Sequence, residues 1–167
     1  RVFITGGAGF IGTHLAEILV EDNEVIIFDA LYRDALQYSE IKNHKNLRLI
    51  KGDVLDYDKL EQSLDNIDIV VHMAAIAGVK TVISKPTTTL KINLMGTYNI
   101  LELCREKNIN RFIFFSTSEV YGPQIYEADE GGMTTLGPIG KPRWVYAISK
   151  LASEFLAESY HKEHQIK

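Results

Sequence analysis

Cysteine is almost absent from this sequence, since Cys104 is the only one among 167 residues. A single thiol excludes a disulfide framework and makes a zinc site built from cysteines implausible, and we expect no metal site. Such cysteine usage is typical of reducing compartments, so we expect a cytoplasmic location.

Long apolar runs are missing too. No stretch approaches the eighteen or more apolar residues that a membrane-spanning helix needs, so we expect no membrane partner. Arg1 opens directly onto a strand-like run without the pattern of a secretory signal. We therefore expect the chain to begin near its natural start.

A strongly basic surface is the third absence, because the formal net charge is -4. This charge argues against nucleic acid or an anionic membrane as the main partner. It leaves a phosphate ligand open, since backbone N–H groups hold phosphate without net positive charge. Hydrophobic residues at 46% and charged residues at 24% match a globular protein, and the length suits one domain with a real core.

Short β-branched runs alternate with helical patterns along the chain. This alternation predicts an α/β fold with a doubly wound parallel sheet and helices on both faces. The expected strands are residues 2–5, 24–28, 47–51, 69–73 and 111–115. Each is nearly continuous in apolar residues, as in strands that are covered on both faces.

Helices are expected between these strands. The first carries its apolar face at Ile11, Leu15, Ile18 and Leu19. Asp56 is a plausible cap for a helix over residues 57–64. Two longer helices are expected near residues 88–107 and 145–164. Residues 122–143 are rich in glycine and proline, and we expect this long loop to serve as a functional cover.

The first strand leads into GGAGFIG, residues 6–12, and then into a helix. Gly6, Gly9 and Gly12 have the spacing of a dinucleotide-binding turn, in which one glycine permits the turn, one lets backbone approach a pyrophosphate and one allows close packing. The helix N-terminus favours the negative charge. Phe10 and Ile11, which open this helix, are also expected to contact the bound cofactor. A P-loop is excluded, and a tight turn without ligand is the alternative.

Asp29 ends the second strand, where a Rossmann-type fold keeps an acidic residue for the adenosine ribose. Its charge would repel a 2′-phosphate, which favours NAD over NADP, although Arg33 lies nearby and could soften that preference. The alternative is a turn residue at a strand end.

The fifth strand ends in four polar residues, Ser116, Thr117, Ser118 and Glu119. Either they simply end the strand, or the strand places them where a reaction takes place. Tyr146 and Lys150 are four residues apart on an expected helix, so they lie on the same face of it. A free tyrosine has a pKa of roughly 10. A neighbouring ammonium and a nicotinamide ring would favour the phenolate, so we expect a lowered pKa that makes the tyrosine a base.

Five motifs occur in one order: GGAGFIG, GDV at 52–54, HMAA at 72–75, FSTSEVYG at 115–122 and VYAISK at 145–150. With these motifs the chain resembles the extended short-chain dehydrogenase/reductase family, the NAD-dependent nucleotide-sugar epimerases, dehydratases and decarboxylases. It looks most like the UDP-glucuronate decarboxylase and UDP-sugar 4-epimerase branches, so the implied cofactor is NAD and the implied partner a UDP-sugar.

The resemblance implies further cofactor contacts. Asp53 and Val54 would meet the adenine, while Ala74 and Ala75 would let backbone pass close to the cofactor. Asn93 would hold loop backbone near the active site, among the cofactor-binding residues. The alternatives are a turn carboxylate for Asp53 and a helix-face polar group for Asn93.

The resemblance also implies a catalytic or binding role for three residues. Lys150 would bind the nicotinamide ribose and Thr117 a sugar hydroxyl, while Tyr146 takes the C4 proton as C4 gives hydride to NAD⁺. Two more residues, His72 and Cys104, are better interpreted as core residues.

The 4-keto sugar then leads to epimerisation, 4,6-dehydration or decarboxylation. The related dTDP-glucose dehydratases have an acidic residue where Ser118 stands, which disfavours dehydration, although GDP-mannose dehydratases carry Thr-Ser-Glu. Glu119 leaves the reaction type open. A non-catalytic NAD(H)-binding module is the alternative of another class.

In the resembling family a further strand and a C-terminal substrate domain follow the Tyr-Lys helix. We therefore expect residues 1–167 to be the NAD-binding domain of a longer enzyme and the fragment alone to be inactive. The resemblance also implies a homodimer through the helices near 88–107 and 145–164.

Overall fold

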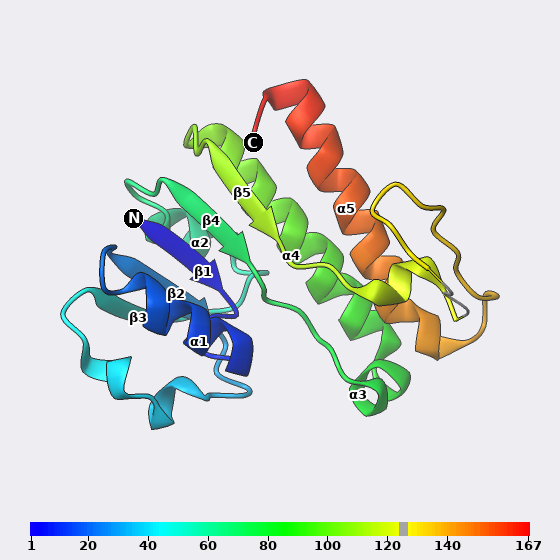
Figure 1. Ribbon diagram of the computed structural model, residues 1–167, viewed down its shortest axis with the longest axis horizontal. Coiled ribbons are helices and arrows are strands. Elements are labelled where there is room, and N and C mark those ends of the chain that lie inside the picture. The colour runs from blue at the N-terminus through cyan, green and yellow to red at the C-terminus, as the bar shows by residue number, and fades with distance from the viewer. Residues whose placement is uncertain (124–126) are drawn as a thin grey trace.

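The computed structural model describes residues 1–123 and 127–167. Within this part of the chain a five-stranded parallel sheet has the order β3-β2-β1-β4-β5 (Figure 1). The strands are β1 Val2–Thr5, β2 Val25–Asp29, β3 Leu47–Lys51, β4 Ile69–His72 and β5 Arg111–Phe114. The chain winds outward from β1 in one direction and then, from β4, in the other. This confirms the predicted doubly wound fold, whose ligand crevice lies at the carboxyl ends of the strands around that reversal.

Helices cover the two faces of the sheet. The α-helices are α1 Phe10–Leu19, α2 Tyr57–Ser63, α3 Val79–Ser84, α4 Pro86–Glu106 and α5 Val145–His164. Short 3-10 turns are η1 Leu36–Tyr38, η2 Glu40–Asn43, η3 Ser118–Tyr121 and η4 Pro142–Trp144. One core packs α2, α4 and α5 against the sheet, and a second core packs α1 against the other face. The long helices α4 and α5 lie side by side (Figure 1).

The edges of the sheet correct one prediction. β1, β2 and β4 are covered as expected, but Leu49 in β3 and Ile113 in β5 are 41% and 42% exposed. These strands lie at the two ends of the sheet order and each pairs with a single neighbouring strand. The apolar runs of β3 and β5 therefore do not indicate strands that are covered on both faces of the sheet.

The packed face of α1 was predicted only in part, because Leu15 and Leu19 do pack against the second core. Ile11 and Ile18 are 61% and 75% exposed, whereas the buried positions are Gly12, Thr13 and Ala16. Small side chains let the helix lie directly on the chain beneath it, because a Cβ on Gly12 would come 2.6 Å from Gly7 Cα. The close approach at Gly12 and the apolar contacts of Leu15 and Leu19 together set the orientation of this helix.

The other helices agree better with the sequence. Asp56 caps α2 by accepting a hydrogen bond from the Lys59 N–H at 3.2 Å, and α5 has the predicted bounds. Helix α3 was not predicted. In the loop 122–143, residues 124–126 lie outside the described residues, and the role of the loop as a cover stays a prediction. In the described part of the chain, every helix is too short or too polar to cross a membrane.

Candidate cofactor and active site

The glycine-rich turn between β1 and α1 has a backbone that side chains would disrupt. Gly6 has a φ of 71°, and a Cβ there would come 2.6 Å from the Ala74 N. Gly12 is required by its contact with Gly7. A Cβ on Gly9 would meet only the Gly6 carbonyl oxygen within 4 Å, at 3.3 Å. The fold therefore explains Gly6 and Gly12 better than it explains Gly9.

The N-terminus of α1 is open to a ligand. Gly9 is its N-cap, no side chain caps it, and its first turn contains no acidic residue. The first N–H groups of a helix have no partner within the helix, so this end suits a diphosphate. The side chains of Phe10 and Ile11 are largely exposed, which leaves their backbone as the predicted contact. The residues present thus fit the phosphates of a dinucleotide.

Asp29 lies at the carboxyl end of β2, beside this turn. Its carboxylate accepts hydrogen bonds from the Leu31 N–H at 2.7 Å and the Ala8 N–H at 3.1 Å. Burial raises the pKa of Asp29 above its ordinary value, these two bonds oppose the rise, and Asp34 adds to it. The side chain therefore already ties the end of β2 to the glycine-rich turn. Contact with a ribose stays a prediction.

The predicted adenine residues lie just after β3. Asp53 accepts a hydrogen bond from the Leu55 N–H at 3.0 Å, as a turn carboxylate does. Val54 is buried against α4, because a Cβ on Gly96 would come 2.5 Å from its side chain. Asn99 on α4 also donates to the Val54 carbonyl at 3.0 Å. The α4 partners, Gly96 and Asn99, were missed because no sequence motif marks them.

Asn93 on α4 holds the segment that follows β4. It is 1% exposed, accepts from the Ile76 N–H at 2.8 Å and donates to the Ile76 carbonyl at 3.2 Å. The expected hold on loop backbone is present. Ala74 and Ala75 lie in the same segment, and Ala74 passes directly beside Gly6. Their contact with a cofactor stays a prediction.

Lys150 joins α5 to the end of β5. Its buried ammonium donates to the Phe115 carbonyl at 2.6 Å and lies 4.5 Å above the centre of the Phe114 ring. Burial lowers the pKa of Lys150 to about 8, while Glu154 acts in the opposite direction. Burying an ammonium group at the carboxyl end of β5 costs desolvation free energy. Charged groups that are buried at such a cost are common at functional sites.

Tyr146 corrects the expected electrostatics. The side chain is half-buried one helical turn before Lys150, and its pKa is raised rather than lowered. Burial is the main cause and the negative charge of Glu119 is the second. The ammonium of Lys150 bonds to the Phe115 carbonyl instead of offsetting these effects. The protein alone therefore holds Tyr146 as the neutral phenol.

The hydroxyl-rich end of β5 forms the turn η3. Thr117 caps it by accepting a hydrogen bond from the Glu119 N–H at 3.3 Å, while Ser118 is exposed. A cavity of about 650 Å³ adjoins this turn and is lined by Thr117, Ser118 and Tyr121 among others. The structure thus brings Glu119 near Tyr146, but among the described residues neither Tyr146 nor Lys150 lines this cavity. The delivery of the hydroxyls to a reaction stays a prediction.

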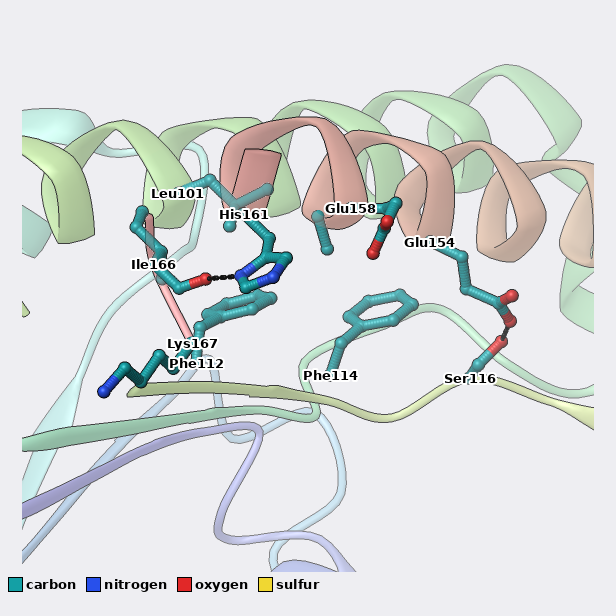
Figure 2. A pocket seen from close by; sticks show the side chains of 10 residues that line it. Leu101, Phe112, Phe114, Ser116, Glu154, Glu158, His161, Ile166 and Lys167 are labelled. Carbon is teal, nitrogen blue, oxygen red and sulfur yellow. Dashed lines mark hydrogen bonds between the residues drawn. The ribbon is translucent and has the colours of Figure 1, made fainter. Parts of the chain in front are cut away.

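A second cavity, of about 430 Å³, runs between β5 and α5 (Figure 2). Phe112 and Phe114 line it, and the bond from the Ser116 hydroxyl to Glu154 lies at one end. At the other end the His161 ring bonds the Ile166 carbonyl (Figure 2). None of the predicted catalytic residues lines this cavity, but Ser116 and Glu154 line both this cavity and the 650 Å³ cavity, so the two adjoin.

His72 and Cys104 are core residues, as predicted. His72 is 1% exposed between the hydroxyls of Thr5 and Thr97, at 2.6 and 3.1 Å. Burial, with a smaller contribution from Lys150, lowers the pKa of His72 from 6.5 to about 3. Burial also raises the pKa of Cys104 to about 12, so its thiolate is not available as a nucleophile.

Acid should destabilise the fold through His72. Its folded-state pKa lies below its ordinary value of 6.5, so its contribution is fully present above pH 6.5 and is lost as the pH falls towards about 3. We expect the free energy of unfolding to fall by up to about 1.4 kcal/mol per pH unit from this group. Urea unfolding between pH 4 and 7 measures it, with His72→Gln as the control. An equal pH dependence in both proteins would contradict the assignment.

Three relatives show what the chain is similar to. It is 40% identical to UDP-N-acetyl-alpha-D-glucosaminuronate decarboxylase of Bacillus cytotoxicus, over 96% of this chain and 50% of the relative. It is 36% identical to human dTDP-D-glucose 4,6-dehydratase, over 99% of this chain and 48% of that protein. The structure of UDP-N-acetylglucosamine 4-epimerase from Methanobrevibacter ruminantium M1, in complex with UDP-N-acetylmuramic acid, superposes with a TM-score of 0.88 at 33% identity, over 99% and 52%.

UDP-glucose 4-epimerase from Brucella ovis, in complex with NAD, has a TM-score of 0.83 at 28% identity, over 99% of this chain and 49% of that one. The chain spans about half the length of the curated relatives described above. Residues 2–167 match the model of the family described as NAD dependent epimerase/dehydratase family. With its doubly wound sheet, its glycine-rich turn and its Tyr146–Lys150 helix, the chain belongs to the NAD-dependent epimerase/dehydratase family.

Proposed function

We propose that this chain is the NAD-binding half of an enzyme that decarboxylates a UDP-linked uronate by transient oxidation at sugar C4. The observation that carries the proposal is the buried Lys150 ammonium, which is bonded to the end of β5 one turn after Tyr146. A non-catalytic NAD-binding module would not need to bury a lysine at this place. The 40% identity to a UDP-uronate decarboxylase supports the choice of substrate.

The cofactor would lie across the carboxyl ends of the strands. The glycine-rich turn and the N-terminus of α1 would hold the diphosphate of NAD, and Asp29 would bind the adenosine ribose. Lys150 would bind the nicotinamide ribose through hydrogens that its bond to Phe115 leaves free. When bound, NAD⁺ supplies the hydride acceptor for C4 of the sugar.

Tyr146 would act as the base that removes the C4 hydroxyl proton and returns it when C4 is reduced again. Because burial and Glu119 raise its pKa, positive charge must be supplied at the assembled site to favour the phenolate. The nicotinamide ring of NAD⁺ would supply that charge, because the Lys150 ammonium is bonded to the Phe115 carbonyl. Thr117 would hydrogen-bond a sugar hydroxyl and fix the substrate beside Tyr146, since the turn that it caps brings Glu119 near Tyr146.

Decarboxylation follows from the 4-keto group. A carboxylate on C5 is then a β-keto acid, which loses CO₂ by breaking the C5–C6 bond, after which C5 takes a proton and C4 is reduced. Dehydration instead needs an acid for the leaving hydroxyl, and Ser118 is a poor one. The 4-epimerase reaction is the second candidate, favoured by the fit to the Methanobrevibacter epimerase.

The rest of the enzyme would follow residue 167. Lys167 already pairs with β5 as a further parallel strand would, because its N–H donates to Asn110 at 3.0 Å and its carbonyl accepts from Phe112 at 2.8 Å. We propose that the chain continues there into a sixth strand and a substrate domain. The half coverage of the relatives supports this division.

A homodimer through α4 and α5 is part of the same proposal. Both helices expose large apolar side chains, Met95 and Tyr98 on α4 and Ile148 and Phe155 on α5. Phe155 is 66% exposed. Apolar surface shared by two adjacent helices is suited to burial against a second copy of the same pair.

The activity is tested with the full-length protein and NAD. We expect UDP-glucuronate to yield CO₂ and a UDP-pentose, and UDP-N-acetylglucosaminuronate to yield CO₂ and a UDP-2-acetamido-pentose, with the products identified by NMR. UDP-glucose and UDP-N-acetylglucosamine are the parallel substrates, and inversion at C4 without loss of mass would transfer the assignment to the epimerase. The isolated 167-residue chain is the control and should turn over none of them. Turnover by that fragment would contradict the proposed division.

A further inference from the structure

A continuous path of contacts connects the glycine-rich turn with the backbone of Tyr146. Gly6 lies against Ala74, and two residues later Ile76 exchanges two hydrogen bonds with the Asn93 amide. The amide of Asn93 also donates to the Ser149 hydroxyl at 2.9 Å. That hydroxyl donates in turn to the Tyr146 carbonyl at 2.7 Å. The path therefore joins the proposed cofactor turn to the first turn of α5.

Ser149 is the residue in this path whose identity needs explanation. It is 0% exposed, and a serine bonded to a carbonyl one turn earlier in its own helix is ordinary. The bond from Asn93 is different, because it comes from another helix 56 residues away in the sequence. An alanine would fill much of the same space and leave this Asn93 N–H without its partner.

The start of α5 needs such an anchor. Its N-cap is Trp144, with no side chain that caps the helix, and Tyr146 is its second residue. Helix ends fray, so a base placed in a first turn needs a tie from outside the helix. The Asn93–Ser149 bond provides that tie at a buried position.

We propose that Ser149 is a positioning residue, which fixes Tyr146 relative to the cofactor turn by anchoring the first turn of α5 to Asn93. The inference rests on the proposed function, because it takes Tyr146 as the base. Ser149 itself touches neither the substrate nor the cofactor. Its loss should therefore slow the chemical step and leave binding intact.

The test compares Ser149→Ala with Ser153→Ala in the full-length protein. Ser153 is equally buried one turn further along α5 and bonds the Asn93 carbonyl at 3.4 Å, but in the described part of the chain it makes no hydrogen bond to Tyr146. We expect Ser149→Ala to lower kcat about tenfold to hundredfold with KM and NAD affinity unchanged, because misplacement of a base by about 1 Å has effects of this size. Ser153→Ala should keep the kcat of the wild-type protein.

If Ser149→Ala does not fold, Ser149→Cys is measured, since a thiol is a weaker hydrogen-bonding group and should give an intermediate kcat. A normal kcat in the folded Ser149 variant, or an equal fall in both serine variants, would overturn the inference. Tyr146→Phe is measured beside them. Its full activity would overturn the proposed function and the inference together, whereas an inactive Tyr146→Phe with a normal Ser149→Ala would overturn the inference alone.

Discussion

Gly6→Ala is expected to destabilise the fold and abolish NAD binding. The left-handed φ of 71° costs a non-glycine residue about 1–2 kcal/mol, and the Cβ would also lie 2.6 Å from the Ala74 backbone nitrogen. Relief of that contact must move either the turn or the segment after β4. Both are proposed cofactor contacts. Urea unfolding and calorimetric titration with NAD measure the two losses in the full-length protein.

Two glycine variants serve as controls for Gly6→Ala. Gly131→Ala adds a methyl group at an exposed site with ordinary φ, so stability and NAD binding should not change. Gly9→Ala should cost less stability than Gly6→Ala, because its Cβ meets only one oxygen at 3.3 Å, yet it should weaken NAD binding at the helix N-terminus. Tight NAD binding by both Gly6→Ala and Gly9→Ala would show that the turn does not hold the cofactor.

Tyr146→Phe is expected to lower kcat by about 10²–10⁴-fold, the usual contribution of a general base. Phenylalanine keeps the half-buried ring and removes only the hydroxyl, so KM and stability should change little. Tyr38→Phe is the matched control, since Tyr38 is 85% exposed and lies 108 residues before Tyr146 in the sequence. Steady-state kinetics on the full-length protein measure both variants, and a Tyr146→Phe enzyme with the wild-type rate would refute the role of Tyr146.

Much of the fold could be predicted because its signals are local. Each strand is a short apolar run, and α5 begins and ends as the sequence indicates. The packed face of α1 was predicted at Leu15 and Leu19 but not at Ile11 and Ile18, because the helix also turns on how closely Gly12 and Gly7 approach. Exposure of Leu49 and Ile113 depends on the places of β3 and β5 in the sheet, which no local pattern records.

The candidate site divides in the same way. Spacing within a motif placed Gly6 in the turn and Lys150 on α5. Pairs that are distant in the sequence carry no such signal, and the bonds from Asn93 to Ser149 and from Ser116 to Glu154 span 56 and 38 residues. The raised pKa of Tyr146 in the protein without NAD could not be predicted for a related reason. Burial and the position of Glu119 are properties of the fold, and both favour the neutral phenol.

Transient oxidation at C4 is the central claim, and a deuterium label at that carbon tests it most directly. The full-length protein is incubated with NAD and a UDP-uronate that carries deuterium at C4, and the UDP-pentose is examined by NMR and mass spectrometry. Hydride transfer to NAD⁺ and back predicts a product that keeps the deuterium at C4, together with a slower reaction than the unlabelled substrate shows. A product that has exchanged this label with solvent, formed without reduced nicotinamide, would contradict the account.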